Sequence, residues 1–312
     1  MVIIAVFPGQ GSQTPGFLEP WLDIDGVRPR LEQFSQWAEV DLIEAGTDAD
    51  ADTIRDTRIA QPLIVAASVL SWELFAQRVS TPVDGVAGHS VGEFAALAAA
   101  GVIDAETALR LVGIRGRAMA DAASLADTGM SAVIGGDQAV VEESLAALEL
   151  TPANFNGGGQ IVAAGAAAAL AALSAEPPAG TRVIPLSVAG AFHTHYMAPA
   201  VDTLRSAIAA VTPSDPGLQL WTNRDGSRVG SGAEALSLVV DQVASPVRWD
   251  ACMQSFAAAG VTGLIEFAPG GTLVGLAKRA LRGVPSVAVK TPEDLTSAAE
   301  LVATASAQGE AE

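Results

Sequence analysis

The chain has 312 residues, 50% of them hydrophobic and 17% charged, so it can bury a large core and is neither disordered nor fibrous. Its net charge of -18 argues against nucleic-acid binding, which depends on neutralising phosphates with Lys and Arg. The single cysteine, Cys252, excludes an intramolecular disulfide and a CxxC metal or redox site.

The N-terminal residues lack a basic segment followed by a long apolar run, so no signal peptide is indicated. The apolar run Val2–Phe7 has only the length of a strand, and no other stretch looks long enough to cross a bilayer. We therefore expect a cytoplasmic protein that has no membrane segment.

The N-terminal part of the chain alternates between strand and helix patterns. Val2–Phe7 is continuously apolar and ends at Pro8-Gly9, as is typical of a strand buried on both faces. The elements expected after it are a helix at Ala60–Arg78, a strand at Val83–Ala87, and helices at Phe94–Ala100 and Ala105–Ala123. This alternation predicts an α/β fold with a mostly parallel sheet.

The middle of the chain shows a different order of elements, βαββαβ, which is the ferredoxin-like pattern. The strands are expected at Ser131–Gly135, Pro152–Asn156, Gln160–Gly165 and Thr181–Val188, and the helices at Asp137–Leu148 and Ala166–Ser174. Gly157-Gly158-Gly159 would form the central hairpin. We predict that residues 126–189 form a small ferredoxin-like subdomain, inserted into a large hydrolase-like one made of residues 1–125 and 190–312.

The α/β alternation resumes after the insert. Helices are expected at Tyr196–Val211, Ala233–Val243, Trp249–Ala259 and Thr272–Leu281, and strands at Leu218–Thr222, Gly263–Phe267 and Ser286–Val289. The segment Thr291-Pro292-Glu293-Asp294 has a capping residue, a proline and then acids, which predicts the start of a last helix.

Gly88-His89-Ser90-Val91-Gly92 matches G-x-S-x-G between a predicted strand and a predicted helix, the context of a nucleophile elbow. The two glycines allow a tight turn that exposes the serine, and the helix N-terminus favours a developing negative charge. Ser90 is therefore the candidate nucleophile, and the N–H of Val91 is a natural oxyanion donor. The competing interpretation is an ordinary tight turn in which a serine caps the helix.

A serine nucleophile needs a base, and the sequence contains three histidines. His89 precedes Ser90 at a strand end, where successive side chains point to opposite faces, so it should not reach the hydroxyl. His193 and His195 remain as candidates. No histidine follows His195, which weakens an α/β-hydrolase triad, because the histidine of such a triad comes late in the chain.

Arg115 is expected on the inner face of its helix. At ~100° per residue it shares a stripe with apolar residues such as Leu111 and Met119, whereas Arg110 and Arg117 lie on the opposite side. A buried guanidinium should have an anionic partner. That partner could be a buried Asp or Glu, or a substrate carboxylate held by two parallel hydrogen bonds.

With these residues assembled, the chain resembles malonyl-CoA:acyl-carrier-protein transacylases and the acyltransferase domains of polyketide synthases. The resemblance extends over nearly the whole length. It rests on Phe7–Gln13, Gln61-Pro62, Gly88–Glu93, Arg115-Gly116, Asn154–Asn156, Gly190–His193, Ser245–Trp249 and Pro269-Gly270. The fold that this family implies agrees with the predicted hydrolase-like core and ferredoxin-like insert.

The resemblance assigns roles to individual residues. It implies that Ser90 is the nucleophile, His193 the base and Arg115 the partner of the malonyl carboxylate. It further implies a Ser–His dyad without an acidic third member. The remaining family positions are the oxyanion donors Gln10 and Val91, a glutamine, Gln242, whose backbone carbonyl orients the histidine, and three residues around the substrate, Phe192, Asn156 and His89.

The resemblance also implies ping-pong transfer of malonyl from malonyl-CoA to the phosphopantetheine thiol of holo acyl-carrier protein, without a metal or another cofactor. Phe192 would disfavour an α-methyl branch on the acyl group. A free-standing chain that begins at the first strand and ends soon after the last helix favours fatty-acid synthesis. We expect a monomer, because no long exposed apolar helix is indicated. Residues suggested for carrier docking are Arg117, Lys278, Arg279 and Arg282.

Two other functions remain open at this point. A serine thioesterase or esterase would use the same elbow, although an inward arginine would then require acidic acyl substrates. A non-catalytic acyl-CoA-binding module would not need Ser90, His193 and Arg115 together.

Overall fold

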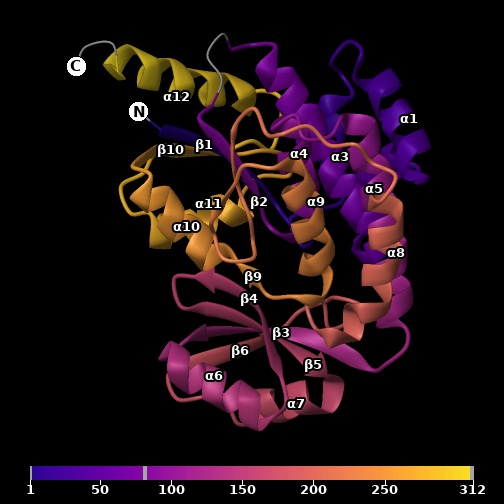
Figure 1. Ribbon diagram of the computed structural model, residues 1–312, viewed down its shortest axis with the longest axis vertical. Coiled ribbons are helices and arrows are strands. Elements are labelled where there is room, and N and C mark those ends of the chain that lie inside the picture. Colours follow the sequence, from indigo (N-terminus) through magenta and orange to yellow (C-terminus); the bar gives the residue numbers. More distant parts are fainter. Residues whose placement is uncertain (1, 80–82, 310–312) are drawn as a thin grey trace.

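The computed structural model describes residues 2–79 and 83–309, which form two sheets with helices packed around them (Figure 1). The larger sheet has the strand order β11-β10-β1-β2-β7-β8. Its strands are β1 (Val2–Phe7), β2 (Gly85–Gly88), β7 (Gln219–Trp221), β8 (Arg228–Val229), β10 (Val261–Glu266) and β11 (Ser286–Ala288). Every pair is parallel except β7 with β8. The predicted mixed α/β class with a mostly parallel sheet is confirmed.

Strand β1 lies at the centre of this sheet and is covered on both faces, as its continuous apolar run predicted. Ile3, Ala5 and Phe7 belong to one hydrophobic cluster, while Ile4 and Val6 belong to another. This division follows from the strand period of two, which sends successive side chains to opposite faces.

Helices from both halves of the chain cover the two faces of the larger sheet. The hydrophobic cluster that contains Ile3 also includes residues of α1 (Val27–Ala38), α2 (Leu42–Thr47), α3 (Thr57–Ala76), α4 (Glu93–Ala99), α5 (Ala105–Ala123), α8 (Ala198–Ile208), α9 (Gly232–Asp241) and α12 (Asp294–Gly309). The Ile4 face packs against α10 (Trp249–Ala258) and α11 (Thr272–Ala280). Five 3-10 turns complete this part: Glu19–Trp21, Thr53–Arg55, Ser90–Gly92, His195–Met197 and Gln242–Ala244. The helices α1 and α2 were not predicted.

Helix α3 corrects one expectation from the sequence. It has 20 residues, and its most apolar 18-residue window has a mean hydropathy of 1.5, so it is long and apolar enough to cross a bilayer, although 72% of that window is buried inside the protein. It is the one such helix in the described part of the chain. The continuous apolarity has a structural reason, because α3 is surrounded by α1, α2, α4, α5 and α12.

The smaller sheet has the order β6-β3-β5-β4-β9. The segment 128–185 supplies β3 (Thr128–Gly135), α6 (Gln138–Ala147), β4 (Thr151–Gly157), β5 (Gln160–Ala166), α7 (Ala167–Ala175) and β6 (Thr181–Pro185). These four strands pair antiparallel, and α6 and α7 lie at the end of the molecule away from the larger sheet (Figure 1). Gly158 and Gly159 form the hairpin at positive φ, as the glycine run predicted.

Two details of the smaller sheet were not predicted. Strand β6 ends at Pro185 rather than Val188, and the chain after it turns toward the cavity described below. A fifth strand, β9 (Val247–Arg248), comes from far along the chain and pairs parallel with β4 through Asn154 and Phe155. The two sheets are thereby joined at the place where the cavity lies.

Candidate active site

Ser90 occupies a strained turn between β2 and α4. Its φ of 52° lies in the left-handed region, which non-glycine residues seldom adopt. A Cβ atom on Gly88 would lie 2.0 Å from the carbonyl carbon of Gly92, and one on Gly92 would lie 2.2 Å from the oxygen of Phe7. Glycine is therefore required at both flanking positions, which is what a nucleophile elbow needs.

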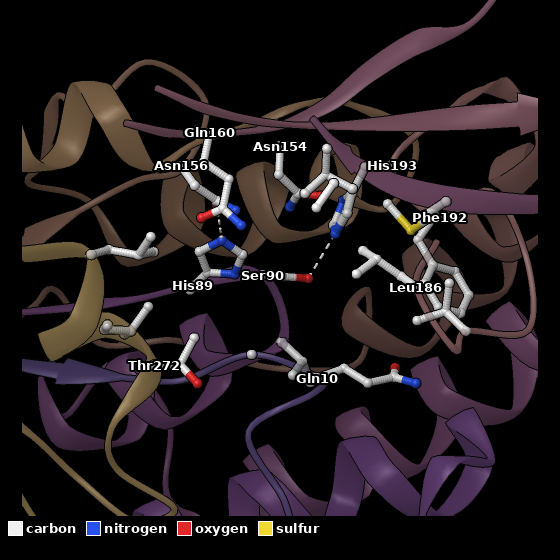
Figure 2. A pocket seen from close by; sticks show the side chains of 18 of the residues that line it. Gln10, His89, Ser90, Asn154, Asn156, Gln160, Leu186, Phe192, His193 and Thr272 are labelled. Atoms are coloured by element: carbon white, nitrogen blue, oxygen red, sulfur yellow. Dashed lines mark hydrogen bonds between the residues drawn. The ribbon is translucent and has the colours of Figure 1, made fainter. Parts of the chain in front are cut away.

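His193 is the histidine that reaches this serine. Its Nε2 lies 2.7 Å from Ser90 Oγ (Figure 2). Its Nδ1 lies 2.8 Å from the backbone carbonyl oxygen of Gln242. Because that oxygen can only accept, Nδ1 carries the proton and Nε2 is free to accept from the serine hydroxyl. The predicted nucleophile and base are therefore in hydrogen-bond contact, and the carbonyl of Gln242 orients the ring.

The environment of His193 keeps its imidazole neutral. Burial, with the charge of Arg115 as the second cause, lowers the pKa of His193 to about 3. A histidine that is neutral in the resting protein is ready to accept the serine proton.

We expect the rate of Ser90 acylation to lack the acid limb that an ordinary histidine would give near pH 6.5. Since the pKa of His193 is lowered, its base form persists as pH falls through 6.5, and activity should be retained down to about pH 5. Acylation rates measured from pH 5 to 8, with protein stability checked at each pH, test this. A loss of activity centred near pH 6.5 would contradict it.

Arg115 points into the interior, as the helical period predicted, and is 1% exposed. Its Nη1 donates to Gln61 Oε1 at 2.7 Å and its Nη2 to Gln242 Oε1 at 3.1 Å, while Nη2 also lies 3.5 Å from Ser90 Oγ. Of the two anionic partners considered, a contacting Asp or Glu is not found: within the described residues Arg115 forms no ion pair, and its Nε has no hydrogen-bond partner. Burial lowers the pKa of Arg115 to about 10, so the guanidinium stays charged at neutral pH.

The two predicted oxyanion donors, Gln10 and Val91, both line the cavity beside Ser90. In the described part of the chain, neither backbone N–H donates to another protein group. Val91 follows the nucleophile and Gln10 follows β1, so the two come together because β1 and β2 are parallel neighbours ending at the same edge.

His89 points away from the nucleophile, as expected. Its Nε2 lies 2.9 Å from Asn156 Oδ1 of β4 (Figure 2). Its ring also meets that of Trp249 edge-on. Burial lowers the pKa of His89, so this ring is neutral as well. His195, the other candidate base, is exposed and stacks on Tyr196.

A cavity of about 190 Å³ lies between the larger and the smaller sheet, with Ser90 and His193 in its wall (Figure 2). Of the predicted substrate residues, Phe192, Asn156 and His89 line it directly. Arg115 and Gln242 contact Ser90 from behind the wall. Lining residues that received no role from the sequence include Gln61, Asn154, Gln160, Leu186 and Thr272.

Sequence reasoning gave no role to two further polar residues beside the nucleophile. Asn223 accepts a hydrogen bond from the Ser90 N–H at 2.7 Å through Oδ1 and donates to the carbonyl of Gly88 at 2.7 Å. Glu93 ends the elbow motif and is buried beneath it. Asn223 follows β7 at the carboxyl edge of the sheet, which is where ligand-binding residues of parallel sheets gather and where it could have been sought.

The described residues contain no group of three or more His, Cys, Asp or Glu side chains placed to hold a metal ion. What the geometry does present is a strained serine on an elbow, a neutral histidine at 2.7 Å and a buried arginine beside them, at the carboxyl edge of a parallel sheet. These features define a serine-nucleophile enzyme that works on acyl groups.

Comparisons with known proteins narrow this class. The acyl transferase domain family matches residues 4–305. The malonyl CoA-acyl carrier protein transacylase of Mycobacterium tuberculosis strain H37Rv is 49% identical over 302 residues, covering 96% of this chain and 100% of that protein. The chain belongs to the acyl transferase family.

Solved structures agree with this assignment. The crystal structure of the Mycobacterium tuberculosis enzyme has a TM-score of 0.93 at 50% identity, covering 96% of this chain and 100% of that one. A malonyl-transacylase in complex with a holo acyl-carrier protein of a type II polyketide synthase has a TM-score of 0.89 at 31% identity, covering 96% and 99%.

Proposed function

We propose that this chain transfers a malonyl group from malonyl-CoA to the phosphopantetheine thiol of an acyl-carrier protein, through an ester on Ser90. One observation carries the proposal: the base Nε2 of His193 and the cationic Nη2 of Arg115 approach the same hydroxyl oxygen, at 2.7 and 3.5 Å. A nucleophile that is paired with a base and lies beside a fixed cation suits an acyl group that carries a carboxylate.

In the first half-reaction, His193 Nε2 accepts the Ser90 proton as Oγ attacks the thioester carbonyl carbon. The negative charge that develops on the carbonyl oxygen is stabilised by the N–H groups of Gln10 and Val91. The C–S bond then breaks, His193 returns the proton to the departing CoA sulfur, and malonyl-Ser90 remains.

In the second half-reaction, the thiol of the carrier's phosphopantetheine gives its proton to His193 and attacks the ester carbonyl. Ser90 leaves and takes the proton back, and the malonyl thioester of the carrier is released. The chemistry requires that the thiol reach the ester before water does. The reaction as proposed uses no metal and no bound cofactor, since each proton is carried by His193.

Arg115 would bind the malonyl carboxylate. Its guanidinium is held by the amides of Gln61 and Gln242, which are neutral acceptors, so its charge is not neutralised by a contacting carboxylate before substrate arrives. This favours transfer over the alternatives weighed from the sequence, a general thioesterase or esterase and a non-catalytic acyl-CoA-binding module. A neutral acyl substrate would leave the buried guanidinium without an anion in direct contact, and a silent module would not need the Ser90–His193 pair.

We assign the finer substrate contacts to the cavity wall. Phe192 would narrow the pocket against an α-methyl branch, a discrimination worth about 1–3 kcal/mol. His89 and Asn156, which bond to each other at 2.9 Å, would present one polar edge toward the substrate.

We interpret residues 126–189 as a ferredoxin-like subdomain inserted into a hydrolase-like one made of residues 1–125 and 190–312. The order β6-β3-β5-β4 with antiparallel pairing supports the first part, and the elbow at the edge of a parallel sheet supports the second. Strand β9 would then be the contribution of the large subdomain to the sheet of the small one.

The proposed partner is acidic, and the basic end of α11 is the docking surface that we favour for it. Thr272 at the start of this helix lines the cavity, while Lys278 and Arg279 lie in its last turn, with Arg282 just beyond. Arg279 also reaches Gln160 at the β4–β5 hairpin. A cytoplasmic monomer serving fatty-acid synthesis remains our expectation.

Intact mass measurement after mixing the protein with malonyl-CoA tests the proposed function. A mass increase of one malonyl group on Ser90, discharged faster by holo acyl-carrier protein than by water, is the expected result. CoA release with neither an adduct nor transfer to the carrier would show a hydrolase instead.

A further inference from the structure

Glu93 is a buried carboxylate that the proposed mechanism does not use. It lies at the first residue of α4, three positions after Ser90, and is 4% exposed. Its Oε1 accepts the backbone N–H of Asn223 at 2.8 Å, and its Oε2 accepts a short hydrogen bond from Gln242 Nε2. Both donors belong to residues that contact the nucleophile.

The contact with Glu93 is one of three that orient the side-chain amide of Gln242. The NH2 group of Gln242 faces Glu93 Oε2, the carbonyl oxygen of Ser90 and Asn223 Oδ1, which can all accept a hydrogen bond. The amide oxygen is then left to face Arg115 Nη2, at 3.1 Å. With the amide reversed, an NH2 group would oppose the guanidinium, and both would be donors. Glu93 therefore supports the acceptor of Arg115, the Gln242 amide oxygen, although Glu93 and Arg115 are not in contact with each other.

A second connection runs from Glu93 to the elbow. Asn223, held through its backbone N–H by Glu93, receives the Ser90 N–H on Oδ1 at 2.7 Å. Gln242 Nε2 also lies 3.2 Å from the carbonyl oxygen of Ser90 and 3.2 Å from Asn223 Oδ1. Both backbone polar groups of a residue at positive φ are thus bound by side chains that Glu93 supports.

Two effects act on the charge of Glu93. Burial raises its pKa to about 8, which alone would leave the carboxyl largely protonated at pH 7, although the Asn223 N–H and the charge of Arg115 lower it. Both oxygens face donors, a backbone N–H and an amide NH2, and these contacts favour the ionised form. The guanidinium and the carboxylate face opposite ends of one amide, so each partly compensates the other in the interior. Burial, with the charge of Glu93 as the second cause, raises the pKa of the Cys252 thiol on α10.

We propose that Glu93 is a positioning residue that, through the amides of Gln242 and Asn223, orients the guanidinium of Arg115 for the acyl carboxylate and holds Ser90 in its strained turn. The role of Glu93 in selecting malonyl-CoA over acetyl-CoA rests on the proposed malonyl transfer, whereas its support of the Ser90 turn does not.

Glu93→Gln tests the proposal, because the new amide has one oxygen where the carboxylate has two: it can accept one of the two donors and must turn its NH2 group toward the other. We expect the KM for malonyl-CoA in Ser90 acylation to rise at least about 10-fold, with a smaller change for acetyl-CoA, because only malonyl uses Arg115. Glu93→Asp, which keeps both acceptor oxygens, should recover part of the malonyl activity and also serves if Glu93→Gln does not fold.

Glu266→Gln is the matched control. Glu266 is 0% exposed and accepts three backbone N–H groups at the start of α11, without any bond to Arg115, Gln242 or Asn223. The Glu266→Gln variant should have a lower melting temperature and should slow Ser90 acylation by malonyl-CoA and by acetyl-CoA equally. If Glu93→Gln slows Ser90 acylation equally with malonyl-CoA and acetyl-CoA, as Glu266→Gln does, Glu93 does not orient Arg115.

The rate at which a fluorophosphonate labels Ser90 measures the reactivity of the nucleophile in its turn without any acyl-CoA substrate. We expect Glu93→Gln to be labelled at least about 10-fold more slowly than the unmodified protein. A labelling rate within twofold would overturn the proposed hold on Ser90, even if malonyl-CoA proves not to be the substrate. Failure of the unmodified protein to form a malonyl adduct, with slow labelling of the variant, would refute the proposed function and leave the elbow role supported.

Discussion

Replacing Ser90 by alanine is expected to lower malonyl transfer by at least about 10³-fold and to abolish the malonyl adduct. The reason is that the covalent step requires Oγ, which lies 2.7 Å from the base, and the cavity wall presents no equivalent nucleophile within the described residues. Intact mass and carrier loading measure the two losses separately. An adduct that persists in Ser90→Ala would place the nucleophile elsewhere.

The same experiment extends to the base. His193→Ala should slow acylation by about 10²–10⁴-fold, since general-base assistance is removed while the elbow and the oxyanion donors remain. His195→Ala is the matched control, because this histidine lies two residues away, is exposed and stacks only on Tyr196. Its activity should stay within twofold of the unmodified protein. A similar loss in both histidine variants would show that the segment, rather than the base, had been disturbed.

Replacing Arg115 by alanine is expected to reduce malonyl transfer by about 10²-fold, or roughly 3 kcal/mol, while acetyl transfer falls far less. The guanidinium lies 3.5 Å from Ser90 Oγ and is the buried cation that the described part of the cavity region offers to a carboxylate. Because acetyl has no carboxylate to pair with Arg115, the ratio of acetyl to malonyl transfer should rise when Arg115 is removed. Ser90 acylation measured with both CoA donors gives the ratio directly.

Arg110→Ala is the control for that substitution. Arg110 lies on the same helix, five residues earlier, but is exposed and pairs with Glu106 one turn away. We expect no change in the ratio of malonyl to acetyl. If Arg115→Ala lowers transfer of both acyl groups equally, the arginine supports the site structurally and does not select the substrate.

The local patterns of the sequence were sufficient for the elbow and for the inward arginine. Two glycines around a serine, between a strand and a helix, predict a tight turn with an exposed hydroxyl, and the structure shows why neither flanking position has room for a Cβ. The helical period alone placed Arg115 on the buried face of α5. Both inferences concern residues close together in the chain, where spacing determines geometry.

The central β1 strand and the element order of the insert were predictable for the same reason. Val2–Phe7 is apolar at every position, and the run of strands and helices between residues 128 and 185 follows the expected order. The fifth strand of that sheet, β9, could not be read in this way. It has only two residues, and it pairs with β4 across more than ninety positions of the chain.

What the sequence by itself determined is the nucleophile, the inward cation and the alternation that makes an α/β sheet, because each depends on periods and turns within a few residues. Tertiary structure decided which side chains meet them. The residues taken alone left both His193 and His195 as candidates, the resemblance implied His193, and the fold brings His193 to Ser90. Arg115 was expected to contact an anion, yet its partners are two amides and its countercharge is the carboxylate of Glu93 beyond one of them. Such contacts arise where distant segments converge at one sheet edge, and no local pattern encodes that convergence.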